Sequence, residues 1–193
     1  MTPRPLPENC WLDDCFLNEE FAEALLEQLI AEVNWRQDEI FIFGRWTKIP
    51  RLQNFMGDKN TLYTYSGLQM NASDWHPQIL NIKSNIEART GQSFNAALLN
   101  QYRDGNDSMG WHRDNEPELG SDPIVASVSL GAARRFIFRE IQDKSNKSEI
   151  LLTSGSLLWM GPGTQLKWQH SVPKTKRCHT ARVNITFRQI QSS

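Results

Sequence analysis

The fold of this chain is decided by a stretch near its C-terminal end, Arg182-Val183-Asn184-Ile185-Thr186-Phe187-Arg188. Apolar and polar residues alternate along it without a break, which is typical of a β-strand with one face in a core. Val183, Ile185 and Phe187 share one face, and the polar residues with both arginines share the other. The polar face is either solvated, as on a half-buried strand, or lines the interior of a barrel. The stretch therefore predicts a protein built on β-sheets. It does not decide whether Arg182 and Arg188 are solvated or buried.

More short strands are predicted upstream of this stretch, separated by glycines and polar turns. We place strands at Phe94–Arg103, Ile124–Leu130, Arg134–Glu140, Glu149–Thr153, Ser156–Met160, Trp168–Val172 and Arg182–Gln189. Two helices should precede them: one begins after Asn18 with Leu25, Leu29 and Ile30 on its apolar stripe, and one spans Pro77–Thr90. This order favours a mainly β (α+β) fold of the sandwich or jelly-roll kind, with the N-terminal helices packed outside.

Length and composition limit the class of protein. The 193 residues suffice for one well-filled core, so we expect a single domain. Three cysteines, odd in number and not spaced like a zinc site, favour a reduced intracellular chain. The N-terminus lacks the apolar stretch of a signal peptide, and no apolar run is long enough for a membrane. We expect a monomer without a membrane partner, located in the cytoplasm or, in a eukaryote, the nucleus.

The formal net charge of −1 argues against binding of nucleic acid by bulk electrostatics. Two local basic clusters are compatible with such binding at one face. One cluster is Arg45, Lys48 and Arg51, and the other lies at residues 174–177.

Three residues are candidate metal ligands. His112 and Asp114 are two residues apart, so in an extended segment both side chains point to the same side. His170 lies far downstream. Two imidazoles and one carboxylate can occupy one face of an iron(II) ion and leave the opposite positions open. The alternative is a surface pair of His112 with Asp114, and a hydrogen-bonded core histidine at position 170.

An anionic ligand near this metal is the second expectation. If the polar face of the 182–188 stretch is buried, Arg182 and Arg188 need anionic partners, because an unpaired buried charge costs about 3–5 kcal/mol. Arginine binds a carboxylate through two parallel hydrogen bonds. Asn100 and Tyr102 share a strand face and offer an amide and a phenol to the same ligand. A dicarboxylate would satisfy these groups.

Four ordered motifs in this chain closely resemble those of the AlkB family. They are Asn100-Gln101-Tyr102-Arg103-Asp104-Gly105, Trp111-His112-Arg113-Asp114-Asn115-Glu116-Pro117, His170-Ser171-Val172-Pro173 and the 182–188 stretch. AlkB enzymes are iron(II)- and 2-oxoglutarate-dependent dioxygenases that remove alkyl groups from DNA and RNA bases. The resemblance, which spans residues 41–190, implies a double-stranded β-helix (jelly roll) with a nucleotide-recognition lid. It assigns residues 1–92 to helices and nucleotide-recognition segments, and 93–190 to the catalytic core.

The resemblance implies a role for each motif residue. Iron(II) would be bound by His112, Asp114 and His170. The co-substrate 2-oxoglutarate, used together with O2, would be surrounded by Asn100, Tyr102, Arg182, Asn184, Thr186 and Arg188. Arg182 would pair with its distal carboxylate.

Substrate contacts are also implied by the resemblance. Phe43, Gly44 and Arg45 match a finger loop that enters the base stack of a duplex, with Phe43 as an apolar wedge. The alternative is a core strand at Ile40–Phe43 beneath the helices. A base pocket would include Tyr63 and Tyr65, of which Tyr65 could stack on a flipped base.

Two further segments match substrate-binding parts of the family. Asn115 stands where many relatives carry an acid, and Glu116 remains available beside it. Lys174, Lys176 and Arg177 match a basic loop that contacts phosphates, although a solvated turn is the alternative.

Oxidative dealkylation of N-alkylated bases, of the 1-methyladenine and 3-methylcytosine type, is the implied activity, in DNA or also RNA. Two alternatives stay open: the same chemistry on a protein side chain or small molecule, and a non-catalytic nucleic-acid-binding module. The strand preference also stays open, because residues 41–46 resemble the duplex-repairing branch whereas residues 107–112 resemble the single-strand branch.

Overall fold

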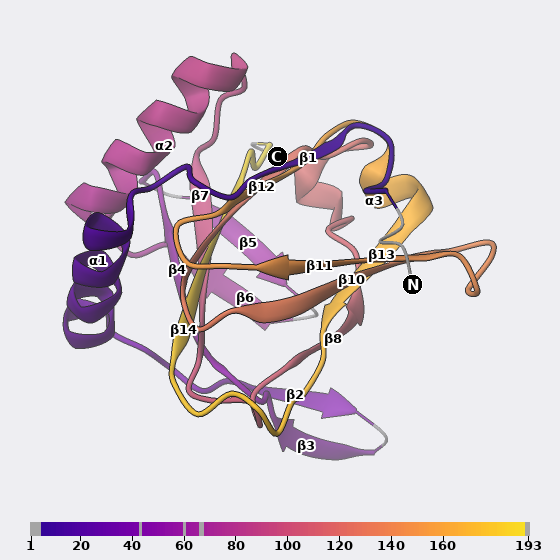
Figure 1. Ribbon diagram of the computed structural model, residues 1–193, viewed down its shortest axis with the longest axis horizontal. Coiled ribbons are helices and arrows are strands. Elements are labelled where there is room, and N and C mark those ends of the chain that lie inside the picture. Colours follow the sequence, from indigo (N-terminus) through magenta and orange to yellow (C-terminus); the bar gives the residue numbers. More distant parts are fainter. Residues whose placement is uncertain (1–4, 43, 60, 66–67, 192–193) are drawn as a thin grey trace.

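A six-stranded and a four-stranded sheet face each other in the structure, a computed structural model that describes residues 5–42, 44–59, 61–65 and 68–191 (Figure 1). The larger sheet has the order β1 (Cys10–Asp13), β12 (Leu157–Met160), β9 (Val125–Gly131), β14 (Arg182–Arg188), β7 (Ala96–Tyr102), β4 (Leu52–Gly57). The smaller sheet has the order β11 (Lys147–Leu152), β10 (Arg134–Glu140), β13 (Trp168–Val172), β8 (Met109–His112). All of these strand pairs are antiparallel, which confirms the predicted jelly roll.

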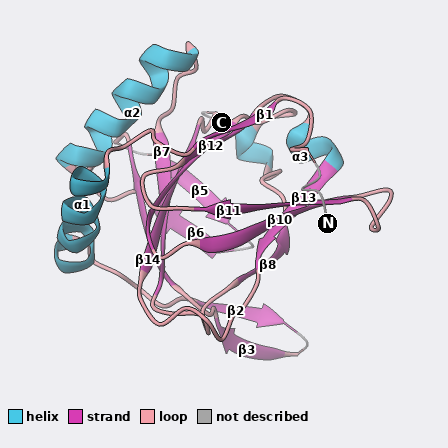
Figure 2. Ribbon diagram, viewed as in Figure 1, coloured by secondary structure: helices cyan, strands magenta, loops and turns pink. Residues whose placement is uncertain are grey.

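The larger sheet separates two apolar cores. On its outer face, α1 (Glu19–Glu32) and α2 (Pro77–Thr90) pack against Val183, Ile185 and Phe187 of β14 (Figure 2). The second core lies on the inner side and includes Leu98 and Phe138. Every residue of β14 is buried, so its polar face looks into the space between the sheets. The alternative of a solvated polar face is therefore wrong.

Local sequence signals account for both helices. The Asn18 side chain accepts a hydrogen bond of 2.8 Å from the backbone N–H of Phe21 and caps α1. Pro77 begins α2, and Gly91 ends it with a φ of 71°, where a side chain would be strained. The expected place of Ile30 on the apolar stripe is wrong, since it is 37% exposed. Ile30 is about 140° around the helix from Leu25, beyond the row that faces the sheet.

Two hairpins form two-stranded sheets of their own. They are β2 (Glu39–Ile42) with β3 (Arg45–Lys48), and β5 (Leu62–Tyr65) with β6 (Leu68–Asn71). The β2–β3 hairpin projects from the lower end of the sandwich in Figure 1. Phe41 and Trp46 are register partners on it, 61% and 68% exposed, with ring centroids 5.5 Å apart. This exposure contradicts a core strand at Ile40–Phe43; Phe43 itself lies outside the described residues.

The N-terminal half also contributes to the main sheet, through β1 and β4. The functional division of the chain at residue 92 stays a prediction. Two short helices complete the described elements, the 3-10 helix η1 (Pro117–Leu119) and α3 (Thr164–Lys167). Within the described ranges, none of the helices combines the length and apolar character that crossing a bilayer requires.

Candidate active site

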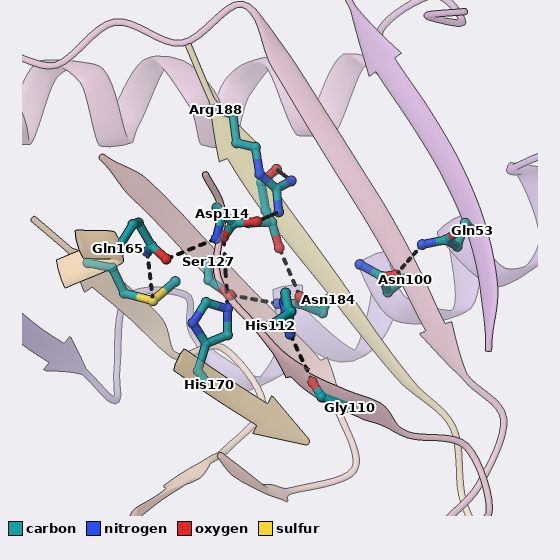
Figure 3. A network of polar contacts seen from close by, with 12 residues as sticks. Gln53, Asn100, Gly110, His112, Asp114, Ser127, Gln165, His170, Asn184 and Arg188 are labelled. Carbon is teal, nitrogen blue, oxygen red and sulfur yellow. Dashed lines mark hydrogen bonds and ion pairs between the residues drawn. The ribbon is translucent and has the colours of Figure 1, made fainter. Parts of the chain in front are cut away.

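Two imidazoles adjoin between neighbouring strands of the smaller sheet. His112 on β8 is the register partner of His170 on β13, and their ring centroids are 4.2 Å apart (Figure 3). The pairing has a β-bulge directly after this pair. The Nδ1 atom of His112 is 2.9 Å from the carbonyl oxygen of Gly110. In the neutral ring, Nδ1–H therefore donates to that carbonyl, which leaves the lone pair of Nε2 for a metal.

The Asp114 carboxylate joins the two rings from the irregular segment after β8. It is completely buried, and its Oδ1 atom accepts a 2.6 Å hydrogen bond from Nη2 of Arg188. The other oxygen, Oδ2, lies 3.8 Å from Nε2 of His170. Within the part of the chain that the structure describes, Oδ2 accepts no hydrogen bond. A buried carboxylate oxygen without a donor is suited to a cation.

Burial and neighbouring charges set the protonation of these three groups. Burial, together with the nearby His112, lowers the pKa of His170 to about 3. Burial also lowers the pKa of His112, although Asp114 opposes that shift. For Asp114, burial alone would raise the pKa, but Arg188 and then the two histidines lower it to about 2. At neutral pH the set therefore contains two neutral imidazoles and one carboxylate, the protonation states that bind a divalent metal.

The donor set fits iron(II) in kind, but its side chains are spaced more widely than in a closed metal site. In the described residues, no three His, Cys, Asp or Glu side chains stand close enough to hold an ion jointly. Two ligands about 2.1 Å from an ion and at right angles to each other are about 3 Å apart. The 3.8 Å between Asp114 and His170 is longer than this. Metal binding would thus bring these two side chains closer by about 1 Å.

A buried guanidinium, that of Arg182, lies at the other end of the same cavity. Arg182 is 1% exposed, and its Nη2 donates a 2.9 Å hydrogen bond to the Ser129 hydroxyl. Among the described residues, its Nε and Nη1 atoms have no hydrogen-bond partner. The guanidinium lies 5.1 Å from the ring centroid of Tyr102, and burial lowers the pKa of Arg182. An incompletely paired buried cation requires an anionic ligand, and a carboxylate fits its two open donors.

All nine residues predicted to bind the metal or 2-oxoglutarate line one cavity between the sheets. They are Asn100, Tyr102, His112, Asp114, His170, Arg182, Asn184, Thr186 and Arg188. Asn184 is fixed by hydrogen bonds to the Ser127 hydroxyl (2.8 Å) and a backbone carbonyl, and the Thr186 hydroxyl donates to the Asn184 amide oxygen. The cavity therefore has the His–Asp–His set at one end and the Arg182 guanidinium at the other, with fixed polar groups between them.

The residues predicted to bind substrate do not line this cavity where they are described. Gly44 and Arg45 are exposed on the β2–β3 hairpin, and Asn115 is exposed just after Asp114, with Glu116 half-buried beside it. Tyr63 and Tyr65 lie on β5, but their side chains are outside the described part of the structure. Phe43 is outside the described residues.

The predicted basic loop is exposed but well anchored. Lys174, Lys176 and Arg177 are exposed between β13 and β14. Two backbone hydrogen bonds of 2.9 Å join this loop to Gly105. The N–H of Thr175 donates to the Gly105 carbonyl, and the N–H of Gly105 donates to the Cys178 carbonyl. These backbone hydrogen bonds hold the loop that carries the three exposed cations.

Three buried side chains at the site have no clear signal in the sequence. Arg51, assigned above to a surface cluster, is 5% exposed and donates a 2.8 Å hydrogen bond to the Asn100 amide oxygen. Arg134 is 1% exposed and donates to the carbonyls of residues 104, 107 and 173. Gln165 accepts a hydrogen bond from the backbone N–H of Asp114. Each partner is distant in sequence, so only the folded chain reveals these roles.

Comparison with known proteins agrees with this geometry. Residues 10–188 match the model of the 2OG-Fe(II) oxygenase superfamily. The chain is 40% identical over 172 residues to the DNA oxidative demethylase ALKBH2 of Mus musculus, covering 86% of this chain and 72% of that protein. It is 38% identical to alpha-ketoglutarate-dependent dioxygenase alkB homolog 3 of Bos taurus, covering 98% of this chain and 68% of that protein.

A solved structure, titled "The structure of OsALKBH1", matches with a TM-score of 0.66 at 19% identity. The match covers 96% of this chain and 100% of that chain. At this level of identity the likeness shows a shared fold.

Proposed function

Because the chain belongs to the AlkB family of iron(II)- and 2-oxoglutarate-dependent dioxygenases, we propose that it removes N-alkyl groups from bases in DNA by oxidation. The observation that supports this most is the single cavity that contains a His–Asp–His set at one end and an open buried arginine at the other. Relatives named DNA oxidative demethylase support DNA as the substrate. We further expect a monomer that acts inside the cell.

The proposed chemistry assigns a task to each part of the cavity. Iron(II) bound by His112, Asp114 and His170 would, with 2-oxoglutarate and O2, supply the oxidising power for hydroxylation of the N-alkyl carbon. Arg182 would bind the distal carboxylate of 2-oxoglutarate, and Arg188 would keep the Asp114 carboxylate turned toward the metal. The buried walls would exclude water from the reaction. A hydroxylated N-alkyl group is unstable, so it leaves as an aldehyde and the unmodified base is restored.

Surface features support nucleic acid as the partner. Exposed aromatic rings beside cations are suited to nucleic-acid strands, because rings stack on bases and cations contact phosphates. The β2–β3 hairpin combines Phe41 and Trp46 with the exposed Arg45 and Lys48. We propose that this hairpin and the basic loop at 174–177 bind the strand. Tyr63, Tyr65, Asn115 and Glu116 would surround the flipped base.

The direct test is incubation with an oligonucleotide that contains 1-methyladenine or 3-methylcytosine, in the presence of iron(II), 2-oxoglutarate and air. We expect equal amounts of formaldehyde and succinate, and none with Asp114→Ala. Binding without formaldehyde would support a non-catalytic module. Succinate formed without formaldehyde, or oxidation of another compound class, would point to a different substrate.

The wedge role of Phe43 has its own test. Replacing Phe43 by Ala should slow repair of a duplex more than repair of a single strand, because only the duplex needs help with unstacking. Equal losses on both substrates would refute the wedge.

A further inference from the structure

The connection between β12 and β13 is bound to the segment that carries Asp114. The backbone N–H of Asp114 donates a 3.1 Å hydrogen bond to Oε1 of Gln165 on α3. The backbone N–H of Gly163 donates a 2.7 Å hydrogen bond to the Asp122 side chain, farther along the same segment. The helix α3 leads directly into β13, which carries His170. One short connection therefore joins two of the candidate metal ligands.

Gln165 is placed to satisfy the backbone N–H of Asp114, for which it is the acceptor found among the described residues. Asp114 follows the end of β8, so no neighbouring strand fixes its backbone. A buried backbone N–H needs an acceptor, and leaving it without one costs about 1–3 kcal/mol. The Gln165 side chain is completely buried. Its Nε2 atom contacts the Met160 sulfur at 3.7 Å, which fixes the direction of the amide so that its oxygen faces Asp114.

We infer that Gln165 is a positioning residue for the metal ligand Asp114, an inference that rests on the metal site proposed above. Gln165 fixes the Asp114 backbone, while Arg188 fixes one carboxylate oxygen from the opposite side, as Figure 3 shows. Together these contacts turn the remaining oxygen, Oδ2, toward His170. Groups that orient a metal ligand without touching the metal commonly change metal affinity about 10–100-fold when they are lost.

The test measures metal binding without turnover. Mn(II), which takes nitrogen and oxygen ligands like iron(II) but does not start the reaction here, is titrated under anaerobic conditions and the free ion is followed by EPR. Gln165→Met keeps the length of the side chain and removes the amide acceptor. We expect its Kd for Mn(II) to rise at least about tenfold. Gln169→Met is the matched control, because Gln169 bonds to Arg139 and not to Asp114; its Kd should match that of wild type.

Each outcome is decisive. A Gln165→Met protein that folds and binds Mn(II) as tightly as wild type overturns the inference. A lower melting temperature with an unchanged Kd would also overturn it, since that is the result of a merely structural role. If Gln165→Met does not fold, Gln165→Asn replaces it, because its amide is one methylene too short to reach Asp114 and the same loss is expected. Failure of the wild type to bind Mn(II) would instead contradict the proposed metal site.

Discussion

Arg188 donates a 2.6 Å hydrogen bond to the Asp114 carboxylate, although the two residues are 74 positions apart in the sequence. Arg188 is 4% exposed and Asp114 is completely buried. The pair joins β14, an inner strand of the larger sheet, to the segment that follows β8, an edge strand of the smaller sheet. It therefore contributes both to the folded state and to the orientation of a candidate metal ligand.

Arg188→Met should lower the free energy of unfolding by about 3–5 kcal/mol, because it leaves the Asp114 charge buried without its partner. Urea unfolding of the metal-free protein measures this change. Arg135→Met is the matched control: Arg135 pairs with Glu149 at 2.5 Å, but both side chains are about half exposed. Its loss should cost about 0–1 kcal/mol. Equal losses for the two variants would contradict the assigned role of Arg188.

Arg182→Met should weaken binding of 2-oxoglutarate without weakening the fold. Charge-assisted hydrogen bonds contribute about 1.5–3 kcal/mol, so the Kd should rise about 10–100-fold. The unfolding midpoint in the absence of ligand should stay the same or increase, because an incompletely paired buried charge is replaced by an apolar chain of similar length. Calorimetric titration with Mn(II) in place of iron measures the Kd. An unchanged Kd would show that the ligand carboxylate binds elsewhere.

The stability of the metal-free protein should fall as the pH drops below about 6.5. Burial lowers the pKa of His170 to about 3, so below pH 6.5 the unfolded chain takes up a proton that the folded chain does not. The free energy of unfolding then decreases by about 1.4 kcal/mol per pH unit for this one group. The lowered pKa of Asp114, about 2, adds a further loss only below about pH 4. Urea unfolding at pH 6.5, 5.5 and 4.5 tests this, and His170→Asn should flatten the slope by one proton.

Gly105→Ala should weaken nucleic-acid binding and leave 2-oxoglutarate binding intact. A Cβ at position 105 would lie 1.9 Å from the Thr175 carbonyl oxygen, so the basic loop must move. Fluorescence anisotropy with a labelled methylated oligonucleotide measures the loss, which should shrink at high salt as phosphate contacts weaken. Gly110→Ala is the control, because a Cβ there meets nothing within 4 Å. If both variants bind like wild type, the loop does not contact the strand.

The elements with strong local signals could be predicted from the sequence. The α2 helix and the strands β10 and β13 have the predicted bounds, since caps, prolines and alternation act over a few residues. The strands β1, β4 and β8 and the two hairpins are not predicted. The strands β1, β4 and β8 are each defined by pairing with a strand that is distant in the sequence. Ile30 was placed on the wrong side because the apolar stripe of α1 is narrower than its composition indicates.

The candidate site divides in the same way. Most motif residues belong to predicted strands, whose faces the alternation of apolar and polar residues fixes. His112 and Asp114 lie on and just after β8, which is not among the predicted strands, and only their two-residue spacing and the family resemblance indicate them. Gln165 and Arg51 could not be found, because a polar residue inside a buried hydrogen bond resembles a surface residue until its partner is known. The partner of Gln165 is 51 residues away and that of Arg51 is 49 residues away. Such contacts depend on how the two sheets pack, which no local pattern records.

The most direct measurement is the visible absorption of the protein under anaerobic conditions as iron(II) and 2-oxoglutarate are added together. Binding of the keto acid to the metal in this cavity should give a weak charge-transfer band. The band should be absent in Asp114→Ala and should need more 2-oxoglutarate in Arg182→Met. A wild-type protein with no band and no succinate on admission of air would contradict the proposed iron and 2-oxoglutarate site.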